Sequence, residues 1–134
     1  MTVKQLSVFL ENKVGRINDV VRVLADNGIN MTAFSIADNT DFGIMRVIVS
    51  DVDKAVKALH EKRFVVNLTD VVCLSCPNVP GALAGILDLL AAEDIFIEYM
   101  YAFSQGDTAN VVIRPTDTKR CLEVLHKHDM EVLK

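Results

Sequence analysis

Short stretches of alternating apolar and polar residues are followed, twice, by stretches with the spacing of a helix. Residues 3–10 alternate, with apolar side chains at every second position, which predicts a strand. The stretch after it places apolar residues at the i, i+3, i+4 and i+7 positions of one helix face: Ile17, Val20, Val21 and Leu24. The chain therefore begins with a strand, a turn and a helix.

The rest of the first half continues this pattern. Asn27-Gly28 predicts the end of the helix, because glycine accepts a left-handed backbone there. Strands are predicted over 29–37 and 42–49, joined by the turn cluster 38–41. Ser50 is predicted to cap a second helix, with Asp53 in its first turn, and a fourth strand is predicted to begin at Phe64.

The same order of elements returns after a shift of 66 residues, without a gap. The predicted elements of the second half are strands over 71–76, 95–103, 109–114 and 130–133, a helix after Gly81 and a helix starting at Thr116 or Asp117. Each half reads βαββαβ, and each crossover is expected to be right-handed. We predict an α+β fold of two ferredoxin-like repeats, 1–68 and 69–134, with antiparallel sheets, helices on one face and a linker at 67–70.

The two strand-to-helix turns share a pattern. The first is Asn12-Lys13-Val14-Gly15-Arg16-Ile17 and the second is Asn78-Val79-Pro80-Gly81-Ala82-Leu83. Such a turn leaves backbone N–H groups exposed at the start of the helix, where a carboxylate is stabilised. We expect the function to lie at these turns.

Composition narrows the class of protein. The 134 residues carry a formal net charge of −4 and no basic block, which argues against nucleic acid as a partner. No apolar stretch has the length of a membrane span, and no signal peptide is expected at the start of the chain. Three cysteines, an odd number, indicate a reduced, cytoplasmic protein. No motif calls for a cofactor.

Both halves resemble the ACT domain family. The resemblance runs from each turn into Leu24-Ala25-Asp26-Asn27-Gly28-Ile29-Asn30-Met31 in the first half and Leu90-Ala91-Ala92-Glu93-Asp94-Ile95-Phe96-Ile97 in the second. The first half has Val14 where the family pattern has the proline seen at Pro80. The second half has Asp94 and Phe96 where the first keeps Gly28 and Asn30.

The resemblance implies a non-catalytic regulatory domain that binds a free amino acid between two copies and acts on a metabolic enzyme. The implied ligand-binding residues are Asn12, Val14, Gly15, Arg16, Asn30, Met31, Thr32, Asn78, Pro80, Gly81, Ala82, Ile97, Glu98 and Tyr99. Helix-start N–H groups would take the α-carboxylate, and Glu98 could pair with an ammonium group. An exposed second-strand edge would be covered by dimerisation, so a homodimer is expected.

Other readings stay open at this point. Cys73 and Cys76 form a C-x-x-C at the position of the cysteines in ferredoxin-like metallochaperones, although their opposite strand parity would separate the thiols. The turn glycines could serve only the fold, in a structural or interaction module without a ligand. His60, His126 and His128 lie near helix ends, where a zinc site would need further ligands.

Overall fold

The computed structural model of the chain describes residues 2–38 and 41–133. Contacts between residues divide the chain into two compact units. Lys4–Thr69 forms one unit, here called the first repeat. The residues from Asp70 onward, with those before Lys4, form the other, here called the second repeat. Among the helices described, none has both the length and the apolar character needed to cross a membrane.

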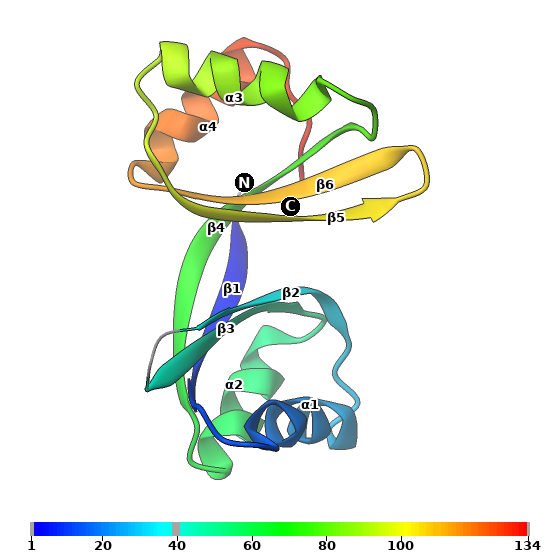
Figure 1. The fold of residues 1–134 in the computed structure, drawn as a ribbon, viewed down its shortest axis with the longest axis vertical. Coiled ribbons are helices and arrows are strands. Elements are labelled where there is room, and N and C mark those ends of the chain that lie inside the picture. Colours follow the sequence, from blue (N-terminus) through cyan, green and yellow to red (C-terminus); the bar gives the residue numbers. More distant parts are fainter. Residues whose placement is uncertain (1, 39–40, 134) are drawn as a thin grey trace. The chain divides into compact units, whose positions relative to one another are not determined.

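The first repeat is a sheet with two helices on one face (Figure 1). Its elements are β1 (Val3–Glu11), α1 (Arg16–Asp26), β2 (Met31–Asp38), β3 (Phe42–Val49), α2 (Val52–Glu61) and the start of β4 (Val65–Pro77). The strands lie in the order β2-β3-β1-β4, and β3 is antiparallel to both β1 and β2. β2 is therefore an edge strand of the first repeat.

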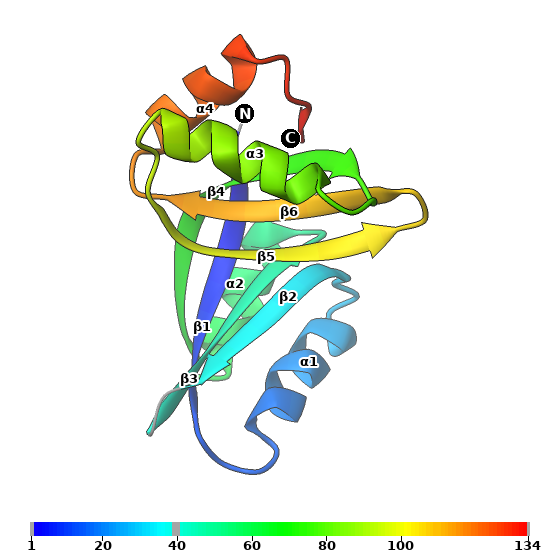
Figure 2. The same cartoon turned by 45° about the horizontal axis from the view of Figure 1, so that its top comes forward.

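The second repeat has the same arrangement, with α3 and α4 on one face of its sheet (Figure 2). Its elements are the end of β4, α3 (Ala82–Ala92), β5 (Ile97–Gln105), β6 (Thr108–Pro115), α4 (Thr118–Lys127) and β7 (Val132–Leu133). The strands lie in the order β7-β4-β6-β5, all antiparallel. The prediction of two ferredoxin-like repeats is confirmed.

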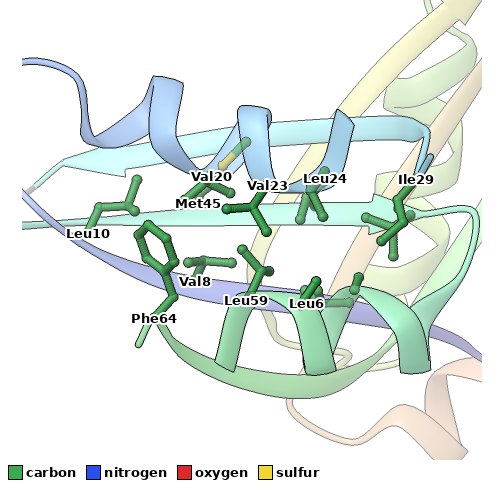
Figure 3. Packing of buried hydrophobic residues seen from close by; sticks show 14 residues of the cluster. Leu6, Val8, Leu10, Val20, Val23, Leu24, Ile29, Met45, Leu59 and Phe64 are labelled. Carbon is green, nitrogen blue, oxygen red and sulfur yellow. The ribbon is translucent and has the colours of Figure 1, made fainter. Parts of the chain in front are cut away.

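Each repeat has its own apolar core between sheet and helices. In the first repeat, Leu6, Val8 and Leu10 point from β1 toward the helices, as the alternation predicted. Leu10 and Phe64 lie at one end of this core and Ile29 at the other (Figure 3). The corresponding residues Val72, Leu74 and Cys76 of β4 lie in the core of the second repeat.

The predicted linker at 67–70 is wrong, because β4 continues through it as one strand of 13 residues. The second strand also begins later than expected, at Met31 instead of Ile29. Gly28 has a φ of 68°, and the Ile29 N–H donates to the Leu24 carbonyl, 2.9 Å away. Ile29 thus closes the end of α1 with a buried side chain and cannot yet pair in the sheet.

Two further local predictions are wrong. Ser50 does not cap α2. Asp51 does, since its side chain accepts from the Lys54 N–H at 3.1 Å. On α1 the buried residues are Val20, Val23 and Leu24, whereas Ile17 and Val21 are 44% and 39% exposed. The apolar stripe is therefore wider than the face that the first repeat covers. Within the predicted turn 38–41, Asn39 and Thr40 lie outside the described residues.

Candidate ligand site at the strand-to-helix turns

The first turn leads from β1 into α1 through a left-handed glycine. Gly15 is the N-cap residue of α1, with φ 91° and ψ −9°. The Arg16 N–H donates to the Lys13 carbonyl at 3.3 Å, and the Asp19 N–H donates to Gly15 at 2.9 Å. No side chain of the described residues caps this helix. The start of α1, which is the positive end of the helix dipole, is thus left without a side-chain cap.

The second turn has the same geometry. Gly81 is the N-cap of α3, with φ 88° and ψ −15°, again without a side-chain cap from the described residues. The Ala82 N–H donates to Val79 at 3.3 Å and the Gly85 N–H to Gly81 at 3.0 Å. Pro80 precedes the cap and is not the first helical residue. Its fixed φ therefore shapes the turn rather than the helix.

The two turn asparagines connect each turn to the following hairpin. The Asn12 N–H donates to the Asp41 carbonyl at 3.4 Å, and Asn12 Nδ2 donates to Asp38 Oδ1 at 2.9 Å. Asn78 donates through its N–H to Asp107 at 2.8 Å, and more distantly through Nδ2 to the Gly106 carbonyl at 3.4 Å. Both asparagines hold the turn in place. In the first repeat, the asparagine also positions a carboxylate.

Arg16 is the first residue of α1 and is held by two contacts. Its guanidinium lies 4.5 Å from the centre of the Phe64 ring, and Nη1 lies 3.1 Å from Asp19 Oδ2. Its Nε is buried and has no hydrogen-bond partner among the described residues. An arginine carries five N–H donors. Asp19 therefore leaves donors for an anionic ligand.

A small pocket of about 160 Å³ lies beside this arginine at the end of the first repeat's sheet. Its apolar lining is Leu10, Ile17 and Ile36. Its polar and charged lining is Glu11, Asn12, Lys13, Arg16 and Asp38, with Gly43 at the sheet. Lys13 Nζ lies 3.0 Å from Glu11 Oε2, and this hydrogen bond and charge lower the pKa of the exposed Glu11 carboxyl.

Larger hollows are also present, but the lining of those described includes neither the turn asparagine nor a residue of β2. One of about 330 Å³ lies along α1 and is lined by Arg16, Asp19, Arg22, Asp26 and Lys62 with Val23 and Phe64. Another, about 450 Å³, is lined by residues of α1 alone, Ile17 and Val21 among them. Val14, at the tip of the turn, is fully exposed and lines none of these hollows. The small pocket at the turn is therefore the best candidate site within the described residues.

A family model for the ACT domain pair matches residues 1–134. The chain belongs to the ACT domain pair family. The resemblance inferred from the turn motifs is thus confirmed over the whole sequence. A search of curated proteins gave no match.

Solved structures resemble this ACT domain pair over nearly its whole length. Protein BT0572 from Bacteroides thetaiotaomicron is 58% identical, with a TM-score of 0.96, over 99% of this chain and 92% of that one. The ligand-free regulatory subunit of aspartate kinase from Thermus thermophilus is 17% identical, with a TM-score of 0.70, over 92% and 90%. The regulatory subunit of aspartate kinase from Thermus flavus is 18% identical, with a TM-score of 0.66, over 92% of this chain and 90% of that one. The latter two share the fold.

The second-strand candidates of the ACT pair lie far from the turn of their own repeat. Asp38 and Leu10 both pair with Gly43, whereas Met31 pairs with Val49, six residues further along β3. That separation is about 20 Å at roughly 3.3 Å per residue. Asn30, Met31 and Thr32 are therefore not brought together with the turn within the first repeat. The same holds for Ile97, Glu98 and Tyr99 in the second, where β5 has the same place in the sheet.

Register shifts fall at equivalent places in both second strands. The shift in β2 lies between Met31 and Ala33 and that in β5 between Ile97 and Tyr99, so Thr32 and Glu98 are the displaced residues. Glu98 already has a cationic neighbour in the second repeat, since Arg114 Nε lies 3.4 Å from its Oε2. Arg114 also donates through Nη1 to the Asp70 carbonyl at 2.9 Å.

The two cysteines of the C-x-x-C motif serve different faces of β4. Cys76 belongs to the core of the second repeat, and Cys73 does not, as their opposite parity predicted. Both are buried, and burial raises the pKa of the Cys73 thiol to about 11. Among the described residues, no group of three or more His, Cys, Asp or Glu side chains could hold a metal ion. The geometry gives no support to a metallochaperone.

Reasoning from the sequence missed Asp38, Ile36 and Phe64 as parts of the site. Asp38 was read only as a turn residue, and Phe64 only as the start of a strand. A comparison of the two repeats could have pointed to Asp38, because the first repeat has an acid where the second has Ser104. Phe64 gave no such signal, because its stacking under Arg16 depends on how the end of α2 packs beside α1.

Proposed function

We propose that this ACT domain pair is a regulatory sensor without catalytic activity, which binds a free amino acid at the strand-to-helix turn and passes the signal to a metabolic enzyme. The observation that carries the proposal is the uncapped start of α1 beside a pocket that holds both charges. Helix-start N–H groups and the helix dipole favour a carboxylate. The regulatory role rests on the family, whose fold is shared with the regulatory subunits of aspartate kinase.

The protein acts as a homodimer in this proposal, with the edge of β2 as the contact between copies. Phe34 and Ile36 of β2 pair with the core residues Val47 and Met45, so they point to the helix side of the sheet. They are nevertheless 57% and 42% exposed, because no strand lies beyond β2 in the first repeat. An uncovered apolar edge of this kind favours pairing with another strand.

Dimerisation would also complete the site. β2 runs from Met31 to Asp38, so antiparallel pairing of two β2 strands about their centres would set Met31 of one copy opposite Asp38 of the other. The residues 30–32 of the partner subunit would then close the pocket at the turn. This arrangement reconciles the ligand-binding residues implied by the family with their separation within one repeat.

The three free cysteines support a reducing, cytoplasmic location for this sensor. All three are buried, and they serve the cores and the sheet rather than a redox site.

Thermal unfolding in the presence of each of the twenty amino acids tests the proposal. A ligand at 100 times its Kd adds about 2.7 kcal/mol to the free energy of unfolding. The expected result is a clear rise in melting temperature with one amino acid or a few related ones, and none with their α-amides. If no amino acid at millimolar concentration changes the melting temperature, the chain is an interaction module without this ligand.

A further inference from the structure

We propose that the two repeats have diverged in function: the first repeat alone recognises a zwitterion, with Asp38 binding the α-ammonium and Arg16 the α-carboxylate of a small aliphatic amino acid. This inference rests on the proposed function and assigns its chemistry to one of the two turns. It follows from three observations on the pocket of the first repeat and from the residues at the equivalent positions of the second.

The first observation is the charge of the pocket. Its lining holds two acidic side chains, Glu11 and Asp38, and two basic ones, Lys13 and Arg16. Glu11 and Lys13 pair with each other at 3.0 Å, which leaves Asp38 of β2 and Arg16 of α1, whose Nη1 also contacts Asp19 Oδ2 at 3.1 Å. A balanced pair of this kind is suited to a molecule that carries both signs, rather than to a simple anion or cation.

The second observation is how these two groups are held. Asn12 Nδ2 donates to Asp38 Oδ1, and a carboxylate can accept further hydrogen bonds at its other lone pairs. Arg16 is fixed by its stacking on Phe64 and by Asp19, while its buried Nε lacks an acceptor among the described residues. Preorganised groups lose little side-chain entropy when a ligand binds.

The third observation is the size of the pocket. Its volume of about 160 Å³ is well below the roughly 300–1,000 Å³ of pockets for drug-sized ligands. Leu10, Ile17 and Ile36 offer an apolar surface to the ligand's side chain. A small aliphatic amino acid matches both the size and the lining.

The second repeat keeps the shape of the turn and lacks the four charged side chains of the first pocket. At the positions equivalent to Glu11, Lys13, Arg16 and Asp38, the second repeat has Pro77, Val79, Ala82 and Ser104. The apolar positions stay apolar, with Cys76, Leu83 and Ala102 in place of Leu10, Ile17 and Ile36.

The asparagine of the second turn is also used differently. Asn12 Oδ1 would lie 3.4 Å from a Cβ added to Gly43, and the second repeat carries that Cβ, on Ala109. There Asn78 Nδ2 faces the backbone carbonyl of Gly106 instead of an acid. At these equivalent positions, the second turn therefore offers helix-start N–H groups but no carboxylate for an ammonium group.

Titration calorimetry of the full chain with L-alanine and L-valine tests this assignment. Propionate, which lacks the ammonium group, and alaninamide, which lacks the carboxylate, are the comparison probes. The expected stoichiometry is one amino acid per chain. Loss of a hydrogen bond to a charged group corresponds to about a 10- to 100-fold loss of affinity. We expect Asp38→Asn to lower the affinity for L-alanine by this factor. Ser104→Ala, the matched change in the second repeat, should leave that affinity unchanged.

The probes distinguish a direct contact from a general loss of structure. If Asp38 binds the ammonium, Asp38→Asn removes the preference for L-alanine over propionate, whereas Arg16→Gln removes the preference for L-alanine over alaninamide. A variant that merely misfolds would weaken all probes alike. Two ligands per chain, or L-alanine binding that Asp38→Asn leaves intact, would overturn the assignment to the first repeat. Binding of only large or charged amino acids would overturn the ligand class, and binding of none would overturn the proposed function itself.

Discussion

The two glycines at the start of α3 give opposite predictions for the same chemical change. Gly81 is the N-cap, with φ 88°, and Gly85 lies four residues later inside the helix, without a positive φ. A Cβ added at either position meets no atom within 4 Å. Steric contact is therefore equal at the two sites, and only the backbone conformation differs.

The magnitudes follow from that difference. Gly85→Ala should stabilise the protein by about 0.5–1 kcal/mol, because alanine loses less backbone entropy in a helix interior. Gly81→Ala should destabilise it by about 1–2 kcal/mol, because an L-residue in the left-handed region brings Cβ close to its own carbonyl. The free energies of unfolding of the two variants should therefore differ by roughly 1.5–3 kcal/mol.

Urea unfolding followed by circular dichroism at fixed protein concentration, without amino acids, measures this difference. With an unchanged m-value, the shift of the midpoint reports the change in the free energy of unfolding. A midpoint that moves in the same direction for both variants would refute the left-handed cap, since two helix-interior glycines would respond alike. Gly15→Ala, at the equivalent cap of the first repeat, should follow Gly81→Ala in sign.

Two further predictions concern the core and the dimer. Burial, with a smaller effect of Asp117, raises the pKa of the Cys121 thiol from 9.0 to about 11. The free energy of unfolding should therefore fall by up to about 2–3 kcal/mol as the pH rises from about 9 to 11. Cys121→Ala should show a shallower dependence of this free energy on pH. Equal slopes for the two proteins would exclude this thiol as the cause. Phe34→Asp should shift sedimentation from dimer to monomer, whereas Phe96→Asp, on an even more exposed aromatic of the second repeat, should not. A dimer that survives Phe34→Asp would place the contact elsewhere.

Much of the fold was predictable because the two halves carry the same apolar pattern. Leu6, Val8 and Leu10 and their equivalents in β4 alternate toward the helices in both cores. The errors arose where a local rule had two solutions. Ser50 and Asp51 both suit an N-cap, and the choice followed from Ser50 accepting the Asn30 N–H at 2.9 Å through its hydroxyl, a contact between segments 20 residues apart.

The width of the buried helix face could not be read from the sequence either. Ile17 and Val21 have the spacing of core residues, yet the repeat leaves them partly exposed along α1. Spacing reports which residues avoid water, and it does not say whether the repeat itself or a second copy covers them. Their exposure beside the edge strand β2 is what the proposed dimer would remove.

The turns show why half of the site was visible in the sequence and half was not. Glycines and asparagines at the turns are set by backbone geometry, so the same residues recur in both repeats. One of the groups that would recognise a ligand comes from a distant strand end. Asp38 contacts the turn through its hydrogen bond to Asn12, 26 residues away in the sequence. Folding requires both turns to keep their shape, whereas ligand recognition requires charges at only one. The second half of a duplicated chain can therefore lack the equivalents of Arg16 and Asp38 and still keep its fold. The residues that differ between the halves in this way are the candidates for ligand binding.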